Sequence, residues 1–141
     1  MNKIKKHLFD TSIDLGLLIL RLGLGIPMMV HGWPKISGGT EMWVKLGSKM
    51  SLLGIDAVPV FWGVMAAVAE FVGGLFLLLG WLTRPASFLL AFTMLVATIY
   101  HYSEEGAGFG DASHALELMM VFIAIYMAGP GKYSMDEKLH R

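Results

Sequence analysis

The chain has 141 residues, of which 55% are hydrophobic and only 16% are charged. That length suits one domain, whereas the polarity is too low for an ordinary soluble protein, so the composition indicates an integral membrane protein. The formal net charge is zero, which gives no basic face for phosphate contacts and argues against a nucleic-acid partner. Cysteine is absent, so any redox role must use a bound cofactor or another subunit.

Four apolar stretches approach the roughly 20 residues that a helix needs to cross a bilayer. In chain order they cover residues 15–33, 59–81, 85–102 and 114–129. The basic start of the chain resembles the flank of a signal peptide, but the long apolar run after it lacks a small-residue cleavage pattern, so the first stretch is predicted to be a retained span. The fourth stretch is short for a span, and a buried helix is the alternative for it.

The stretch between the first two spans is broken by glycines and has an amphipathic middle. Five apolar residues recur there at helical spacing: Met42, Trp43, Leu46, Met50 and Leu53. This pattern predicts a short helix that lies in the membrane interface. The expected fold is therefore a single all-α domain over residues 1–141, an integral membrane four-helix bundle with a short interfacial helix between spans 1 and 2.

The orientation in the membrane is predicted from the Lys and Arg residues outside the spans, because short basic loops stay cytoplasmic. Three of these residues lie on the side of the first and third loops, and seven lie on the side of the two termini. The seven are Lys3, Lys5, Lys6, Arg84, Lys132, Lys138 and Arg141. Both termini are therefore expected to be cytoplasmic.

Three of the apolar stretches contain a charged residue: Arg21, Glu70 and Glu117. A charge inside a membrane segment costs roughly 3 kcal/mol or more, so it usually faces a partner, a cavity or a substrate. Glu70 falls near the middle of the second span and Arg21 about a third of the way along the first. An ion pair between Arg21 and Glu70 is predicted, and a purely structural salt bridge that fixes helix packing is the alternative role for it.

The remaining ionisable residues cluster toward the predicted outer ends of the spans. They are Glu117, His31, His101 and His114, and together they predict a polar pocket that opens toward the outer face. An imidazole beside carboxylates is suited to passing protons near neutral pH, so Glu117, His31 and His101 are the candidate catalytic residues. The alternative is that these side chains are wetted by headgroups or solvent at the helix ends.

Arg21, Glu70, Trp62, Tyr100 and His114 are the candidate ligand-binding residues. Trp62 and Tyr100 could wall the pocket, although aromatic side chains near span ends more often form the interfacial belt.

The same residues also allow two other hypotheses, a haem site and a metal site, and the sequence supports both less than an organic ligand. Haem would require two inward imidazoles, His31 with His101 or His114, and no sequence spacing enforces that arrangement. A metal site from His114, Glu117, Glu70 and His31 has acceptable ligand types but no diagnostic paired motif. The predicted site therefore contains no metal, and haem or metal is favoured less than an organic ligand.

Three glycine-punctuated segments carry a family resemblance. They are LRLGLGIPMMVHGWPKI at Leu20–Ile36, AEFVGGLFLLLGWLTRPAS at Ala69–Ser87 and AGPGKYSMD at Ala128–Asp136. With them the chain resembles the DoxX family of small four-helix membrane proteins over residues 13–136. The positions that match the family's characteristic residues are Arg21, His31, Gly32, Lys35, Glu70, Gly73, Gly74, Arg84 and Pro85.

The resemblance implies a protein of the inner membrane of a bacterial or archaeal cell with a respiratory or oxidoreductase connection. The family is similar to the quinone-reducing subunit of a thiosulfate:quinone oxidoreductase, and its members are also linked to thiol-stress complexes. Our hypothesis is a membrane redox protein, or a subunit of one, that binds a quinone-like ligand and works with a redox partner protein. The hypothesis is also compatible with a homo-oligomer of this chain. The alternative is a non-enzymatic assembly subunit or small-solute carrier with structural buried ion pairs.

Overall fold

The structure is a computed structural model that describes residues 13–139, and the elements in that range are helices. Four of them are long and apolar enough to cross a membrane: α2 (Ile13–Ser37), α4 (Pro59–Leu79), α5 (Thr83–Ser103) and α6 (Phe109–Ala128). The shorter elements are α3 (Gly39–Gly47), the 3-10 helix η1 (Ser48–Leu53) and α7 (Met135–Leu139). The predicted fold class is confirmed, including the short helix between the first two spans.

The observed helices extend the apolar stretches at several ends. α2 continues through Pro34 to Ser37, beyond the predicted end at residue 33. α6 begins at Phe109, five residues before the predicted start, because the Asp111 carboxylate accepts a hydrogen bond from the Gly108 N–H at 2.7 Å and caps the helix. With 20 residues, α6 is long enough to span. Lys3, Lys5, Lys6 and Arg141, which support the predicted orientation, lie outside the described residues, and the orientation stays a prediction.

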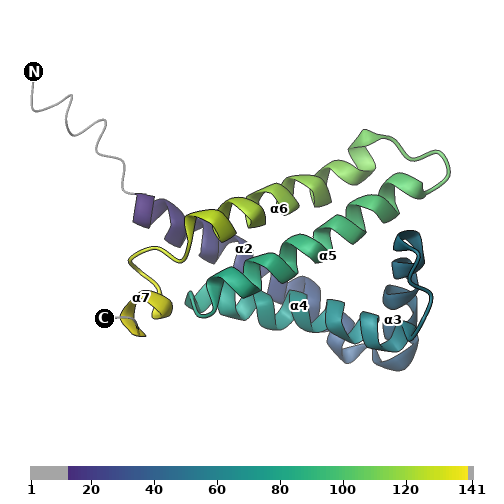
Figure 1. The fold of residues 1–141 in the computed structure, drawn as a ribbon, viewed down its shortest axis with the longest axis horizontal. Coiled ribbons are helices and arrows are strands. Elements are labelled where there is room, and N and C mark those ends of the chain that lie inside the picture. Colours follow the sequence, from purple (N-terminus) through teal and green to yellow (C-terminus); the bar gives the residue numbers. More distant parts are fainter. Residues whose placement is uncertain (1–12, 140–141) are drawn as a thin grey trace, which may run out of the picture.

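The long helices pack in chain order, with α2 against α4, α4 against α5, and α5 against α6. Figure 1 shows α5 and α6 side by side, and α3 at the end of the bundle where α2 leads into α4. We call this the α3 end, and the opposite end, where α2 begins and α6 finishes, the terminus end. All four long helices contribute to one core, through Met28, Leu77, Leu90 and Phe122 among others.

Glycines set the close approach of α2 and α3 to α4. A Cβ on Gly25 of α2 would lie 2.7 Å from the carbonyl oxygen of Gly74. A Cβ on Gly47 of α3 would lie 2.7 Å from the Gly63 nitrogen. Small residues let helix backbones pack this closely in a membrane protein, so α3 is fixed directly onto α4 at the α3 end.

Large apolar side chains cover much of the outside of the bundle. Examples on three helices are Ile19, Val30, Phe88 and Met127, which are 59% to 74% exposed. Such a surface would be unfavourable in water but suits contact with lipid chains. The helices are therefore placed in a lipid membrane.

Candidate functional site

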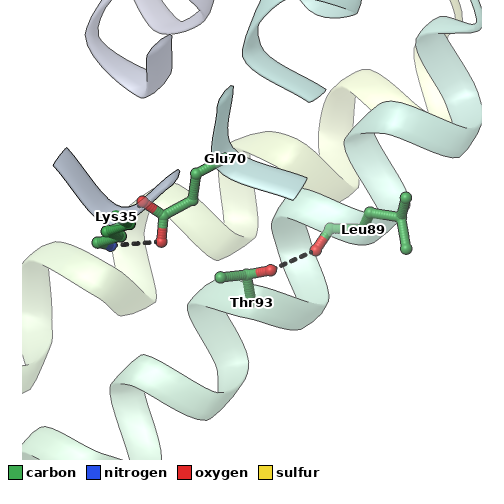
Figure 2. Close-up of polar contacts among 4 residues, drawn as sticks. All are labelled: Lys35, Glu70, Leu89 and Thr93. Atoms are coloured by element: carbon green, nitrogen blue, oxygen red, sulfur yellow. Dashed lines mark hydrogen bonds and ion pairs between the residues drawn. The ribbon is translucent and has the colours of Figure 1, made fainter. Parts of the chain in front are cut away.

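Glu70 lies in the middle of α4 and is only 3% exposed. Its carboxylate accepts hydrogen bonds from the Lys35 ammonium, with Nζ 2.6 Å from Oε1 and 2.5 Å from Oε2. Lys35 stands in the last turn of α2, and Figure 2 shows the Glu70 carboxylate directed at its Nζ, with Thr93 of α5 nearby. The buried carboxylate is thus neutralised by a lysine from the neighbouring helix.

The predicted ion pair between Arg21 and Glu70 is wrong. Arg21 lies fourteen residues before Lys35 in α2, which places it about 21 Å farther along the helix, toward the terminus end. There its side chain is 1% exposed, and a Cβ on Gly80 would overlap the guanidinium. The depth that the sequence predicted for Arg21 relative to Glu70 is wrong because of how α2 is aligned with α4. Arg21 lies level with the end of α4, whereas Glu70 lies in its middle.

The segment after α6 is hydrogen-bonded to the start of α5. The Asp136 carboxylate accepts from the backbone N–H of Leu82 at 2.8 Å and of Thr83 at 2.9 Å. The Asp136 N–H in turn donates to the Gly80 carbonyl oxygen at 2.9 Å. Because the first N–H groups of a helix have no partner within it, Asp136 acts as an N-terminal cap supplied from a distant part of the chain.

The same segment is also tied to α2. Arg21 Nη2 donates to the carbonyl oxygen of Tyr133 at 2.6 Å, and the Asp14 carboxylate accepts from the Lys132 N–H at 2.9 Å. We call Asp14, Arg21 and residues 129–139 the terminal brace. It joins α2, α5 and the chain after α6 mainly through backbone groups.

A pocket of about 200 Å³ lies between α4 and α5 and is covered at the α3 end by α3 and η1. Its lining is mostly apolar, and only Lys35, Lys49, Glu70 and Thr93 contribute polar side chains. The Thr93 hydroxyl donates to the Leu89 carbonyl oxygen of its own helix at 2.9 Å. The ion pair between Lys35 and Glu70, together with Lys49, therefore supplies the charged groups of an otherwise apolar pocket.

The mouth of this pocket is lateral. Met65, Leu89 and Phe92 line it and are 40% or 41% exposed, on the outside of the bundle where lipid chains contact the helices. The other boundary is formed by Leu46 and Met50, which belong to α3 and η1. The sequence predicted an opening toward the outer face, which in the predicted orientation is the end that holds the first loop. In the structure α3 and η1 cover the end with the first loop, and the opening lies between α4 and α5. We call this cavity the lateral pocket.

Lys49 reaches the lateral pocket from η1. Its Nζ lies 3.7 Å from the centroid of the Tyr100 ring, a distance at which the ring face attracts the ammonium. Burial lowers the pKa of Lys49 below its usual value, and the positive charge of Lys35 lowers it further. Within residues 13–139 no salt bridge involves Lys49, so its ammonium can interact with a ligand.

The predicted site residues separate into two groups. Glu70 and Trp62 line the lateral pocket, and the ring of Tyr100 contacts the Lys49 ammonium. His31 on α2, and His114 and Glu117 on α6, have exposed side chains and do not line the pocket.

His101 also lies away from the pocket lining, with its Nδ1 3.4 Å from Oε2 of Glu104. His31 and His114 do not point inward as the haem reading requires. Among the described residues no group of three or more histidines and carboxylates is placed to hold a metal ion.

Sequence reasoning gave Lys35 and Lys49 no role in the site. Lys35 matches the DoxX pattern, but it lies outside the predicted first span, residues 15–33, and so belongs to the predicted first loop. The available signal is its spacing: Lys35 follows Met28 by seven residues and Gly32 by three, so a helix continued through Pro34 puts Lys35 on the buried face of α2. No such signal exists for Lys49, because its position depends on how η1 folds over α5.

Fold and site together define a multi-span helical membrane protein with an ion-paired lateral pocket. The sequence profile of the DoxX family matches residues 16–103, and the chain belongs to the DoxX family.

Three curated proteins are similar to it over most of their length. Inner membrane protein YqjF of Escherichia coli K12 is 34% identical, with 91% of this chain and 95% of that protein covered. Inner membrane protein YphA of the same strain is 26% identical, with 98% and 100% covered. The Bacillus subtilis 168 protein named "Putative oxidoreductase CatD" is 26% identical, with 90% and 89% covered. No solved structure matches the chain.

Proposed function

We propose that this chain is an inner-membrane protein that binds a quinone-like molecule in the lateral pocket, as a redox protein or as a subunit of a redox complex. The observation that carries the proposal is an apolar pocket that faces lipid at its mouth and contains an ion pair and a second lysine. The names of the relatives support it: two are inner membrane proteins, and one carries an oxidoreductase name.

A quinone fits the chemistry of the lining. An apolar cavity of about 150 Å³ suffices to bind benzene, so a pocket of about 200 Å³ has room for one substituted ring. The carbonyl oxygens of a quinone need hydrogen-bond donors, which the ammonium groups of Lys35 and Lys49 supply. The lateral mouth would let an isoprenoid tail remain among the lipid chains beside Leu89 and Phe92.

A bound quinone would supply two-electron, two-proton redox chemistry. The role of the protein would be to orient the ring and to hold protons near its oxygens. Lys35 Nζ donates to both carboxylate oxygens of Glu70, and this pairing fixes the position of the ammonium at the wall of the pocket. Lys49 adds a second donor without a bonded carboxylate, which favours a ligand oxygen that carries negative charge.

The predicted proton-transfer roles of Glu117, His31 and His101 are not part of this proposal. None of the three lines the lateral pocket. Their catalytic role stays a prediction from the sequence, and the pocket proposal rests on Lys35, Lys49 and Glu70.

Binding can be measured on the full chain in lipid nanodiscs, with a short-chain ubiquinone and with menadione as probes. Trp62 lines the pocket, so quenching of tryptophan fluorescence should report occupancy. We expect saturable binding by the native protein and a loss of at least about tenfold in affinity for Ala66→Leu, which fills the pocket. Val68→Leu, on the same helix but away from the lining, is the control. Equal affinities in all three proteins would contradict the proposal.

The rival function is a non-enzymatic assembly subunit or small-solute carrier, and the ion pair between α2 and α4 gives it specific support because such a pair can serve packing alone. The double variant Lys35→Met with Glu70→Leu separates the two cases, since it replaces the pair by apolar side chains of similar size. Under our proposal the double variant folds but no longer binds the quinone probes. Retained quinone binding would favour a structural role for the pair.

A further inference from the structure

Glu117 is exposed although it lies well inside a membrane-spanning helix. It stands eight residues from Phe109 and eleven from Ala128, about 12 Å and 16 Å from the two ends of α6. Within residues 13–139 no hydrogen bond or ion pair to its side chain is present, and the same holds for His114, one turn away and also exposed. Lipid chains offer neither group a hydrogen-bond partner, so leaving either side chain in contact with lipid is unfavourable.

Small residues continue the face of α6 on which Glu117 lies. Gly110, Glu117, Ala124 and Ala128 are separated by seven, seven and four residues, so they share one side of the helix, and all four are exposed. A Cβ placed on Gly110 would meet no atom within 4 Å. We call these four residues with His114 the α6 stripe. Its shape permits a second helix to approach closely at the level of the acid.

We propose that the α6 stripe is the contact surface with a second copy of this chain, in which the two α6 helices pack parallel across a two-fold axis. A two-fold interface joins a surface to itself, so the surface must carry both members of every polar pair. The stripe does so, because it contains an acceptor, the Glu117 carboxylate, and a donor, the imidazole of His114. Glu117 of each copy then bonds the partner's His114, which gives two equivalent hydrogen bonds.

The depth of the two groups agrees with this pairing. Copies of one chain have the same orientation in the membrane, so equivalent residues of parallel helices lie at the same depth. His114 and Glu117 differ by three residues, about 4.5 Å along the axis, which the lengths of the two side chains can bridge. The pairing removes an acid from lipid in both copies.

The α6 stripe is separate from the lateral pocket. No residue of α6 lines that pocket, which lies between α4 and α5. Pairing of two copies through α6 therefore uses no residue of the pocket lining, and this inference does not depend on the proposed quinone binding.

The absence of cysteine in the chain makes single-cysteine crosslinking a direct test. We compare Ala124→Cys, on the α6 stripe, with Ile123→Cys, which is next to it in depth and 40% exposed but faces another side of α6. After copper-phenanthroline oxidation in native membranes, we expect a disulfide-linked dimer for Ala124→Cys and monomer for Ile123→Cys. If Ala124→Cys stays monomeric, or both positions crosslink equally, the proposal is overturned, and a different membrane protein or lipid faces the stripe.

A second comparison tests the polar pair itself. In the Ala124→Cys background, Glu117→Leu should abolish the dimer band, whereas Glu117→Gln, which retains a hydrogen-bond acceptor, should preserve part of it. His114→Leu provides the same test if Glu117→Leu does not fold, as judged by size-exclusion chromatography in detergent. Undiminished crosslinking of a folded Leu variant would overturn the proposed pairing.

Discussion

The terminal brace and the lateral pocket each surround an almost fully buried charge, but the groups that bond to this charge differ. Arg21 donates to a backbone carbonyl through Nη2, while its Nε and Nη1 have no hydrogen-bond partner within residues 13–139. Asp136 accepts from backbone N–H groups. Glu70 is bonded instead by the side chain of Lys35, which is 30% exposed. Backbone groups cannot change partners without local unfolding, whereas a lysine side chain can turn toward a ligand. The contrast supports a role in stability for the terminus end and is in line with the binding role that we propose for the pocket.

The largest loss of stability is expected at Gly80, where the terminal brace leaves no space for a side chain. Gly80 has a φ of +67°, and a Cβ there would overlap the Arg21 guanidinium. Gly80→Ala combines a left-handed backbone strain of roughly 1–2 kcal/mol with this collision, so we expect little folded protein.

Folded yield and the midpoint of thermal unfolding in detergent provide the measurement for this change. Gly23→Ala is the matched control, because a Cβ on Gly23 meets nothing within 4 Å and the residue lies inside α2. The control should be neutral or slightly stabilising. A Gly80→Ala protein as stable as the native chain would show that the brace tolerates rearrangement.

Breaking the ion pair from one side should have the next largest effect. Glu70→Leu leaves the Lys35 ammonium without its carboxylate beside an apolar pocket. Loss of one partner from a fully buried pair costs roughly 3–5 kcal/mol, and because Lys35 is partly exposed we expect about 2 kcal/mol here. Adding Lys35→Met should restore most of the thermal stability. If the double variant is no more stable than Glu70→Leu, the remaining lysine is not the cause of the loss.

Removing the distant cap of α5 should have a smaller effect, confined to stability. Asp136→Ala deletes two hydrogen bonds to the N-terminus of α5 and should cost about 1 kcal/mol, as for other helix caps. Glu105→Ala, in the exposed turn between α5 and α6, is the control and should change little. Affinity for the quinone probes should not change in Asp136→Ala. A large loss of affinity would show that the two regions are coupled.

The smallest predicted effect concerns the pH dependence of stability and Lys49. Burial, followed by the charge of Lys35, lowers the pKa of Lys49 in the folded chain below its ordinary 10.5. Between the lowered pKa and 10.5 the unfolded chain binds more protons than the folded chain, so stability should rise with pH in that window. Lys49→Met should flatten this part of the profile of unfolding temperature against pH. If unfolding temperature has the same slope against pH in both proteins, the Lys49 ammonium is solvated in the folded chain and its pKa is not lowered.

Much of the architecture was predictable, because apolar length marks spans and amphipathic spacing marks the helix between the first two. The sequence also marks Glu70 as a residue that needs a partner, since a charge in the middle of a span is costly. Its partner was not predictable, because the relative shift of α2 against α4 depends on which glycines meet. That shift placed Arg21 at the level of Gly80 and Lys35 at the level of Glu70.

The short turn between α4 and α5 has a mechanical consequence. The two helices are joined at Gly80 and clamped there by Asp136, so any change in the angle between them pivots at that end. Glu70 lies about 15 Å from Gly80 along α4, and Trp62 lies about 27 Å from it. A small rotation therefore displaces Trp62 almost twice as far as Glu70. The pocket would widen most beneath η1, while the contact between Glu70 and Lys35 changes little.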